Sequence, residues 1–225
     1  RGLDFAIELG DFKDQSPTVA ETLSCLEAAE RAFSEFRGPR YHVLGNHDTD
    51  VLTKEEFLAR VANAGQERAL PHYSFAVNGV TFVALDACYE RKDRPYSRCN
   101  PWTDANVPPV ELQWLERKLK EAEGPAVVFC HQRLDSDDDL AVRNAPEVRR
   151  ILERSGRVVA VFTGHHHAGG FNRINGIPYY TLPAVIEGQD AADNAYAIAS
   201  VDSAGGVSIV GYRKLAGDGV WKERK

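Results

Sequence analysis

Short apolar runs alternate with amphipathic helical segments in the first half of the chain, and this alternation constrains the fold more than any other feature. Residues 3–9 form an apolar run, and residues 16–36 show helical spacing after a Ser-Pro start. Residues 41–44 repeat the strand pattern, and residues 53–64 follow as a second helix with Thr53 as its cap. This strand–helix–strand–helix order predicts a parallel sheet.

The second half of the chain adds antiparallel strands. Residues 72–77 and 80–85 flank Asn78-Gly79, the strongest short hairpin signal. We expect helices at residues 110–122 and 146–154, and strands at residues 126–130, 157–163, 170–174, 177–182, 194–201 and 207–212. The predicted fold class is therefore α/β (α+β), with two mixed sheets packed face to face and helices outside.

The composition and net charge of the chain limit the kinds of partner that it can bind. With 225 residues, of which 43% are hydrophobic, it can bury a full core, and we expect residues 1–225 to form one domain. A net charge of −6 and an isoelectric point near 5.7 argue against binding to a nucleic-acid polymer or an anionic membrane surface, because both need a basic face. No apolar run approaches the roughly 18 residues of a membrane span. Composition leaves the oligomeric state open.

The first residue and the cysteines bear on the compartment. The chain opens on Arg1 and contains no methionine, so we expect a preceding segment in the natural protein. Cys88 and Cys99 flank one loop and could close a disulfide in an exported protein, whereas Cys130 lies in an apolar strand and is expected to be a buried thiol. The cytoplasm is favoured, and export stays open.

Polar clusters follow four of the expected strands. They are Gly10-Asp11, with Asp14 three residues further on, Asn46-His47-Asp48, the single His131, and His165 to His167. Ligand sites in α/β sheets gather at the carboxyl ends of strands, so these segments can converge. Carboxylate, amide and imidazole groups together suit manganese, iron, zinc or cobalt, whereas magnesium and calcium prefer oxygen alone. The four clusters in series predict a metal site.

Each cluster by itself has an ordinary structural interpretation. A Gly-Asp pair after a strand is usually a turn, and a lone histidine is usually a hydrogen-bonded structural residue. Side chains alternate along an extended segment, so His166 is expected to point away from its two neighbours and to be a weak ligand candidate. His42 and His72 lie within expected strands, and we assign both to packing or hydrogen bonding. The metal prediction depends on the order and common placement of the other clusters.

The order GD-x-x-D, GNHD, a single histidine after a strand, and GH-x-H resembles the calcineurin-like metallophosphoesterase family over nearly the whole chain. The resemblance implies a four-layer αββα sandwich that holds two divalent metal ions, manganese, iron or zinc, with manganese favoured. By the same resemblance, Asp11 bridges the metals, Asn46, His131 and His165 complete one site, and His167 joins the other.

The family resemblance also implies a catalytic pair. His47 corresponds to the histidine that stabilises or protonates the leaving group, and Asp48 is expected to orient it. The implied reaction is hydrolysis of a phosphodiester or diphosphate bond by attack of a metal-bound hydroxide.

The segments GHHHAGGF, PAVIEGQDAADNAY and LDACY…ELQWLE are similar to the manganese-dependent ADP-ribose/CDP-alcohol diphosphatase group. This similarity implies a phosphorylated small-molecule substrate, such as a nucleoside-diphosphate-linked compound. Residues 87–109 form a long loop rich in proline and arginine, which we interpret as a candidate lid or substrate loop. The residues expected near the substrate are Arg91, Arg94, Arg98, Gly169 and Phe171, and Trp102 and Tyr96 are candidates for stacking a base.

One element of the family pattern is absent from this sequence. The family begins with a strand that ends in D-x-H, and no such block precedes Asp11. We therefore expect a further strand and helix, about 30 to 40 residues, upstream of the sequence in the natural protein. The chain as given is expected to bind one metal better than two. The alternative function is a non-catalytic scaffold or binding protein of the same fold with an incomplete metal site.

Overall fold

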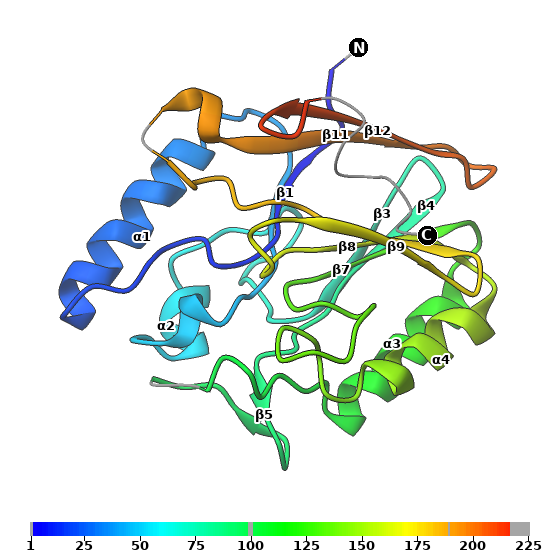
Figure 1. Ribbon diagram of the computed structural model, residues 1–225, viewed down its shortest axis with the longest axis horizontal. Coiled ribbons are helices and arrows are strands. Elements are labelled where there is room, and N and C mark those ends of the chain that lie inside the picture. Colours follow the sequence, from blue (N-terminus) through cyan, green and yellow to red (C-terminus); the bar gives the residue numbers. More distant parts are fainter. Residues whose placement is uncertain (1, 99–100, 189, 217–225) are drawn as a thin grey trace.

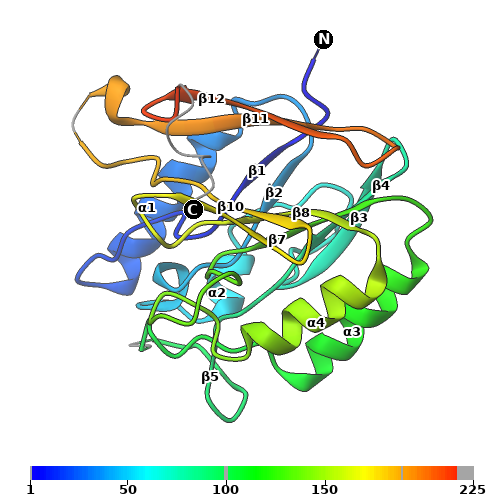
Figure 2. The same ribbon diagram turned by 45° about the vertical axis from the view of Figure 1, so that its right-hand side comes forward.

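Four layers of secondary structure are stacked in the computed structural model, which describes residues 2–98, 101–188 and 190–216 (Figure 1). Helices α3 (Pro109–Glu121) and α4 (Ala145–Ser155) cover one face of a six-stranded sheet. On the other face lie four further strands, followed by helix α1 (Val19–Phe33) on the outside. The view turned by 45° separates the layers (Figure 2). The expected αββα layering is therefore confirmed.

The central sheet is mixed, with strand order β3-β4-β7-β8-β10-β9. Its strands are β3 (Tyr73–Val77), β4 (Val80–Ala84), β7 (Ala126–Cys130), β8 (Val158–Thr163), β9 (Gly170–Ile174) and β10 (Ile177–Thr181). Strands β4, β7, β8 and β10 are parallel, and β3 and β9 add antiparallel edges. Asn78 and Gly79 both have positive φ, 50° and 81°, as a two-residue hairpin turn requires, so the predicted hairpin is confirmed.

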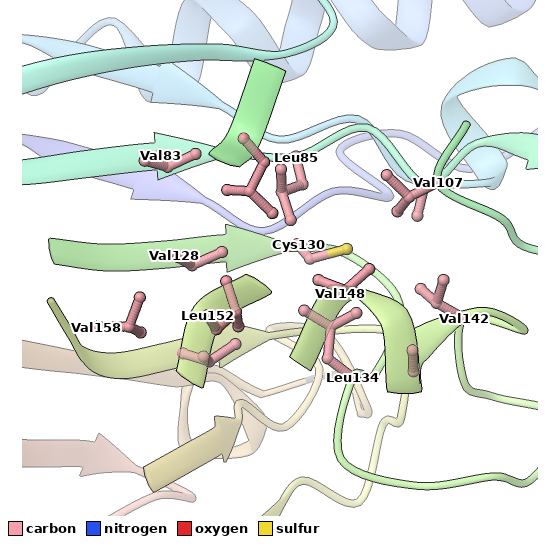
Figure 3. Packing of buried hydrophobic residues seen from close by; sticks show 14 of the residues in the cluster. Val83, Leu85, Val107, Val128, Cys130, Leu134, Val142, Val148, Leu152 and Val158 are labelled. Carbon is pink, nitrogen blue, oxygen red and sulfur yellow. The ribbon is translucent and has the colours of Figure 1, made fainter. Parts of the chain in front are cut away.

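Strand β7 is apolar along its whole length because both of its faces are covered. Val128 and Cys130 point into the core shared with α3 and α4, where Val148 and Leu152 of α4 meet them (Figure 3). Val127 and Phe129 point the other way, into a second core. Alternation of side chains across a strand places successive residues in the two cores, which explains the uninterrupted AVVFC sequence.

The second β layer consists of two separate strand pairs in the described part of the chain. Strands β1 (Ala6–Glu8) and β2 (Arg40–His42) are parallel, and β11 (Ala195–Val201) and β12 (Val207–Arg213) are antiparallel. Partly buried side chains from both pairs, such as Ile7 and Ile209, pack on the aromatic face of the central sheet. The sequence predicted a second mixed sheet, and the structure gives its parallel and antiparallel parts as distinct pairs.

The second predicted helix ends earlier than expected. Helix α2 (Lys54–Leu58) begins with the capping box of Thr53 and Glu56, but it has five residues instead of reaching residue 64. The chain then follows the edge of β2, where Asn63 Oδ1 accepts the backbone N–H of His42 at 2.8 Å. Pairing with β2 therefore ends the helix.

The long segment at residues 87–109 contains its own structure. Strands β5 (Tyr89–Glu90) and β6 (Arg94–Pro95) pair as a short hairpin, and Tyr96 is almost fully buried. The side chain of Asn144, at the N-cap position of α4, makes no capping bond and instead bonds both backbone groups of Val107. Burial of Tyr96 in the middle of the segment and the bonds to Val107 near its end thus hold it to the domain.

Two further expectations concern the cysteines and membranes. Cys88 and Cys130 are both buried free thiols, so Cys130 is placed as expected, whereas Cys99 lies outside the described residues. The Cys88 Sγ atom lies 3.5 Å from the Leu44 carbonyl oxygen. Among the described residues, no helix has both the length and the apolar character to cross a membrane.

Candidate metal centre

The loops that follow four parallel strands meet at one end of the molecule. Strands β1 and β2 are parallel neighbours in one layer, and β7 and β8 are parallel neighbours in the other. Asp11 follows β1, Asn46 follows β2, His131 follows β7 and His165 follows β8. The two β layers face each other, so their carboxyl ends bring together groups that are far apart in the sequence.

Three potential ligands converge on the Nε2 atom of a fourth, His131. This nitrogen lies 3.0 Å from Asp11 Oδ2 and 3.1 Å from Asn46 Oδ1. It also lies 3.2 Å from Nδ1 of His165. The ligand atoms of Asp11, His131 and His165 all lie within 4.8 Å of one another. One carboxylate, one amide oxygen and two imidazoles form a donor set for a borderline divalent cation.

The hydrogen bonds of this cluster are incomplete without a cation. The Nδ1 atom of His131 lies 2.7 Å from the carbonyl oxygen of Leu9, which can only accept, so Nδ1 carries the hydrogen. The Nε2 atom then faces the oxygens of Asp11 and Asn46 and a ring nitrogen of His165. Even a protonated Nε2 has one hydrogen for three neighbours. The His165 Nε2 atom is also buried without a partner. These residues therefore fit a metal ion, and the Leu9 bond fixes the tautomer that a ligand needs.

The backbone at the cluster is strained in two of the candidate ligands. Asp11 has φ 55° and His165 has φ 62°, the left-handed region that non-glycine residues adopt at a cost. The surrounding chain is packed closely enough to hold them there. A Cβ atom on Gly10 would lie 2.5 Å from His131 Nδ1, and one on Gly45 would lie 2.2 Å from the Asp11 nitrogen. The glycines of the GD and GN motifs thus allow the strand ends to approach each other.

Burial and charge hold Asp11 and His165 in the forms that bind a metal. Burial acts to raise the pKa of Asp11, but the charge of His131 and its hydrogen bond outweigh this effect and hold the pKa well below its usual range. Burial, together with the nearby charge of His131, lowers the pKa of His165 to about 3. At neutral pH the carboxylate is therefore ionised and the His165 ring is neutral, as metal ligation requires. Burial also acts to lower the pKa of His131, but the charge and hydrogen bond of Asp11 outweigh it and raise that pKa, so a cation would displace the proton from His131 Nε2.

His47 lies beside the cluster and is held by different partners from those expected. Its backbone N–H donates to Asp11 Oδ1 at 2.8 Å, and its ring Nδ1 lies 2.9 Å from Asp50 Oδ2. The hydrogen bond to Asp50 outweighs partial burial and raises the pKa of His47 to about 8. Asp48, expected to orient this ring, is fully buried and accepts the backbone N–H groups of Gly45, Asp11 and Phe12. The carboxylate on the His47 ring is that of Asp50.

Burial raises the pKa of Asp48, and the negative charges of Glu8 and Asp11 add to the rise. Its backbone donors oppose that change, because they stabilise the ionised form. The three hydrogen bonds join the GD loop to the GN loop. Asp48 therefore holds the two loops in place through their backbone N–H groups and does not contact the His47 ring.

The structure does not gather all the predicted ligands. The His167 ring is 63% exposed, and its Nδ1 atom lies 2.6 Å from Glu187 Oε1. His166 is also outside the convergent group, and Asp14 is an exposed residue whose Oδ1 accepts the N–H of Gln15. His42 and His72 form ion pairs with glutamates. The assignment of His167 to a second metal site stays a prediction.

The residues expected near the substrate have other contacts in the structure. Arg94 is held by Glu90, and Arg98 Nη2 lies 2.6 Å from Glu56 Oε1. The exposed Arg91 donates its backbone N–H to Asp104. The Phe171 ring packs 5.1 Å from that of Tyr180, and Gly169, with φ 69°, lies against Pro183. Their contact with substrate stays a prediction.

Sequence reasoning missed two residues, and the structure gives the position of a third, Trp102, relative to the cluster. The missed residues are Asp50, three positions after His47, and Lys13, which binds Asp50. The three-residue spacing was the only local signal for Asp50. Trp102 is half exposed, and its ring centroid lies 6.0 Å from that of His165.

Residues 2–169 match the model of the family described as calcineurin-like phosphoesterase. The chain belongs to this family. It is 26% identical to a manganese-dependent ADP-ribose/CDP-alcohol diphosphatase from Arabidopsis thaliana, covering 82% of this chain and 72% of the relative. The enzyme of the same name from Oryza sativa subsp. japonica is also 26% identical, covering 82% of this chain and 70% of the relative. The resemblance drawn from the four motifs is confirmed.

Solved structures share the fold of this phosphoesterase. A dimetal phosphatase from Danio rerio superposes with a TM-score of 0.77 at 18% identity, covering 95% of this chain and 82% of the other. A putative 5′-nucleotidase from Staphylococcus aureus gives 0.55 at 15% identity over 95% of this chain and 46% of the other. The protein is a metal-dependent phosphohydrolase of the calcineurin-like family, and divalent metal ions are its cofactors.

Proposed function

We propose that this phosphoesterase uses manganese to hydrolyse a phosphodiester or diphosphate bond in a nucleoside-diphosphate-linked small molecule. The observation that carries the catalytic part is the convergence of Asp11, Asn46 and His165 on the Nε2 atom of His131. No lysine or arginine among the described residues forms an ion pair with Asp11, so the cluster has no permanent cation from the protein.

Different residues of the chain have different roles in the proposed hydrolysis. Asp11, Asn46, His131 and His165 would hold a divalent cation, which neutralises phosphate charge and lowers the pKa of water. His47, next to Asn46 in the chain, presents an imidazole beside this group. A pKa of about 8 keeps much of this ring protonated at neutral pH, so it can give a proton to the departing oxygen.

Two observations support the finer choice of substrate. Both curated relatives carry names for enzymes that act on ADP-ribose and CDP-alcohols. In this chain Trp102 presents a half-exposed indole near the candidate ligand His165. A base can stack on such a ring with a contribution of about 1 to 3 kcal/mol. A nucleoside attached to a phosphate at the cluster would therefore have an aromatic surface within reach.

The catalytic proposal is tested with bis-p-nitrophenyl phosphate, ADP-ribose and a CDP-alcohol. We expect activity that a chelator removes and manganese restores. His47→Ala should lower turnover of ADP-ribose by about 10² to 10⁴ while the bound metal, measured by atomic emission, stays the same. Protein that binds its full complement of metal and hydrolyses none of the three compounds would overturn the proposal in favour of a scaffold.

The role of Trp102 is tested by substitution. Trp102→Ala should raise KM for ADP-ribose by about tenfold, because one stacking contact of about 1.4 kcal/mol is lost. Trp102→Phe keeps an aromatic face and should recover most of the affinity. An unchanged KM in Trp102→Ala would place the base elsewhere.

A further inference from the structure

We propose that Asp50 and Lys13 form a positioning pair that sets the tautomer and orientation of the His47 ring. The pair goes beyond the metal ligands and the catalytic histidine, and the inference rests on the proposed hydrolase function. Neither residue belongs to the recognised GD-x-x-D or GNHD positions, since Lys13 occupies a variable position of the first motif and Asp50 follows the second.

The geometry connects the three side chains in one line of hydrogen bonds. Lys13 Nζ donates to Asp50 Oδ1 at 2.7 Å, and the other carboxylate oxygen, Oδ2, lies 2.9 Å from His47 Nδ1. An ionised carboxylate only accepts hydrogen bonds, so His47 must carry its hydrogen on Nδ1. The Nε2 atom of His47 is thereby left as the position that exchanges a proton with the substrate.

Burial makes this arrangement rigid. The Lys13 side chain is fully buried and that of Asp50 is 15% exposed, whereas His47 is 45% exposed. A buried ammonium is costly without a partner, so Lys13 holds Asp50 in one rotamer. Lys13 is therefore fixed inside the protein, and the His47 ring that Asp50 orients lies at the surface. A buried carboxylate that orients a catalytic imidazole is a general means of keeping the correct ring nitrogen toward the substrate.

The pair also ties the two motif loops to each other. Lys13 lies in the loop after β1, and both His47 and Asp50 lie in the loop after β2. Asp11 accepts the backbone N–H of His47 from the same first loop. Orientation of the His47 ring is therefore coupled to the loop that presents a candidate metal ligand.

The test uses two diesters that differ in how much the departing oxygen needs a proton. p-Nitrophenolate leaves as a stable anion, whereas an alkyl alkoxide needs protonation. Asp50→Ala should lower kcat about 10- to 100-fold for an alkyl leaving group and less than about threefold for p-nitrophenolate, with KM unchanged for both. Lys13→Met should give the same pattern with a smaller loss, and Asp50→Glu should partly restore the alkyl reaction.

Glu121→Ala is the matched control, because Glu121 also accepts a hydrogen bond from a lysine, Lys118, but lies at the end of helix α3 and outside the two motif loops. It should leave the ratio of the two rates unchanged. Folding is checked by circular dichroism and metal content by atomic emission, so a misfolded Asp50→Ala is replaced by Lys13→Met as the deciding variant.

Equal losses for both leaving groups in folded, metal-loaded Asp50→Ala or Lys13→Met would overturn the positioning role, and so would no loss in either. A wild-type protein that hydrolyses neither diester would instead overturn the proposed hydrolase function.

Discussion

Two buried polar clusters lie at the carboxyl ends of the neighbouring strands β4 and β7, and they obtain positive charge in different ways. After β4, the fully buried carboxylate of Asp86 lies 2.5 Å from Lys54 Nζ and also accepts the backbone N–H of Cys88. After β7, His131 faces Asp11 without a lysine or arginine in an ion pair to that carboxylate among the described residues. The first cluster is complete within the protein, and the second is complete only with a metal ion.

The comparison teaches how to separate a structural polar cluster from a functional one. Burying a charge is costly unless it is paired or hydrogen-bonded, so a buried carboxylate needs a cation or, like Asp48, several N–H donors. Where the protein supplies it, as Lys54 does, the cluster stabilises the fold. Where acceptors face one another, as around His131 Nε2, the cluster is arranged for a ligand.

A third buried group, His42, is intermediate between these two clusters, because the protein supplies its positive charge only at some pH values. His42, in strand β2, lies between Glu8 of β1 and Glu30 of α1, with ring nitrogens 3.1 and 3.2 Å from their carboxylates. Its positive charge is present only when the ring is protonated. Burial acts to lower the pKa of His42, but the two glutamates outweigh it and raise the pKa to about 9.

The largest expected effect comes from removing the internal cation. Lys54→Met leaves the Asp86 carboxylate buried without its partner and should lower the free energy of unfolding by about 3 to 5 kcal/mol. Urea unfolding measures the change. The matched control is Lys118→Met on the exposed Lys118–Glu121 pair, which should cost less than about 1 kcal/mol. An unchanged midpoint in Lys54→Met would remove the distinction between the clusters.

Loss of the positive charge of His42 at high pH should lower the free energy of unfolding by less than Lys54→Met does. The pKa of His42 is higher in the folded chain, about 9 against 6.5, so its contribution is fully present below pH 6.5 and is lost as pH rises through about 9. The loss amounts to about 3 kcal/mol. Urea unfolding below pH 6.5 and above pH 9 measures it. His42→Gln should flatten this pH dependence, and a wild-type stability that stays constant over the window would contradict the assignment.

The smallest effect is expected at the metal cluster itself. Manganese at about 100 times its dissociation constant should raise the free energy of unfolding by about 2.7 kcal/mol, because it binds the folded state. Thermal unfolding with and without the ion measures the increment. His131→Ala should abolish it, whereas Lys54→Met should retain it on a lower baseline. An increment that survives in His131→Ala would place the ion outside this cluster.

Much of the fold was predictable because its signals are local. The Asn78-Gly79 turn needs positive φ at two adjacent residues, and the capping box of Thr53 needs groups three residues apart. The apolar run of β7 reports that both of its faces are covered. Such patterns depend on a few neighbouring residues, so the sequence displays them directly.

Other features depended on contacts between distant segments. Helix α2 ends early because Asn63 bonds the backbone of His42, 21 residues away. The Asn144 side chain bonds Val107 instead of capping its own helix, across 37 residues. Local propensity favours the ordinary helix in both places, and only the packed neighbours decide otherwise.

By itself, the sequence determined the kind of chemistry: which residue types follow each strand, in what order, and that together they suit a divalent metal ion and phosphate ester hydrolysis. Only the tertiary structure decided that His131 Nδ1 is tied to the Leu9 carbonyl 122 residues away, and that Asp50 holds the His47 ring. The physical reason is that the residue type at each position can be read directly from the sequence. The hydrogen-bond partner of a side chain depends instead on which strand ends come together when the two β layers pack.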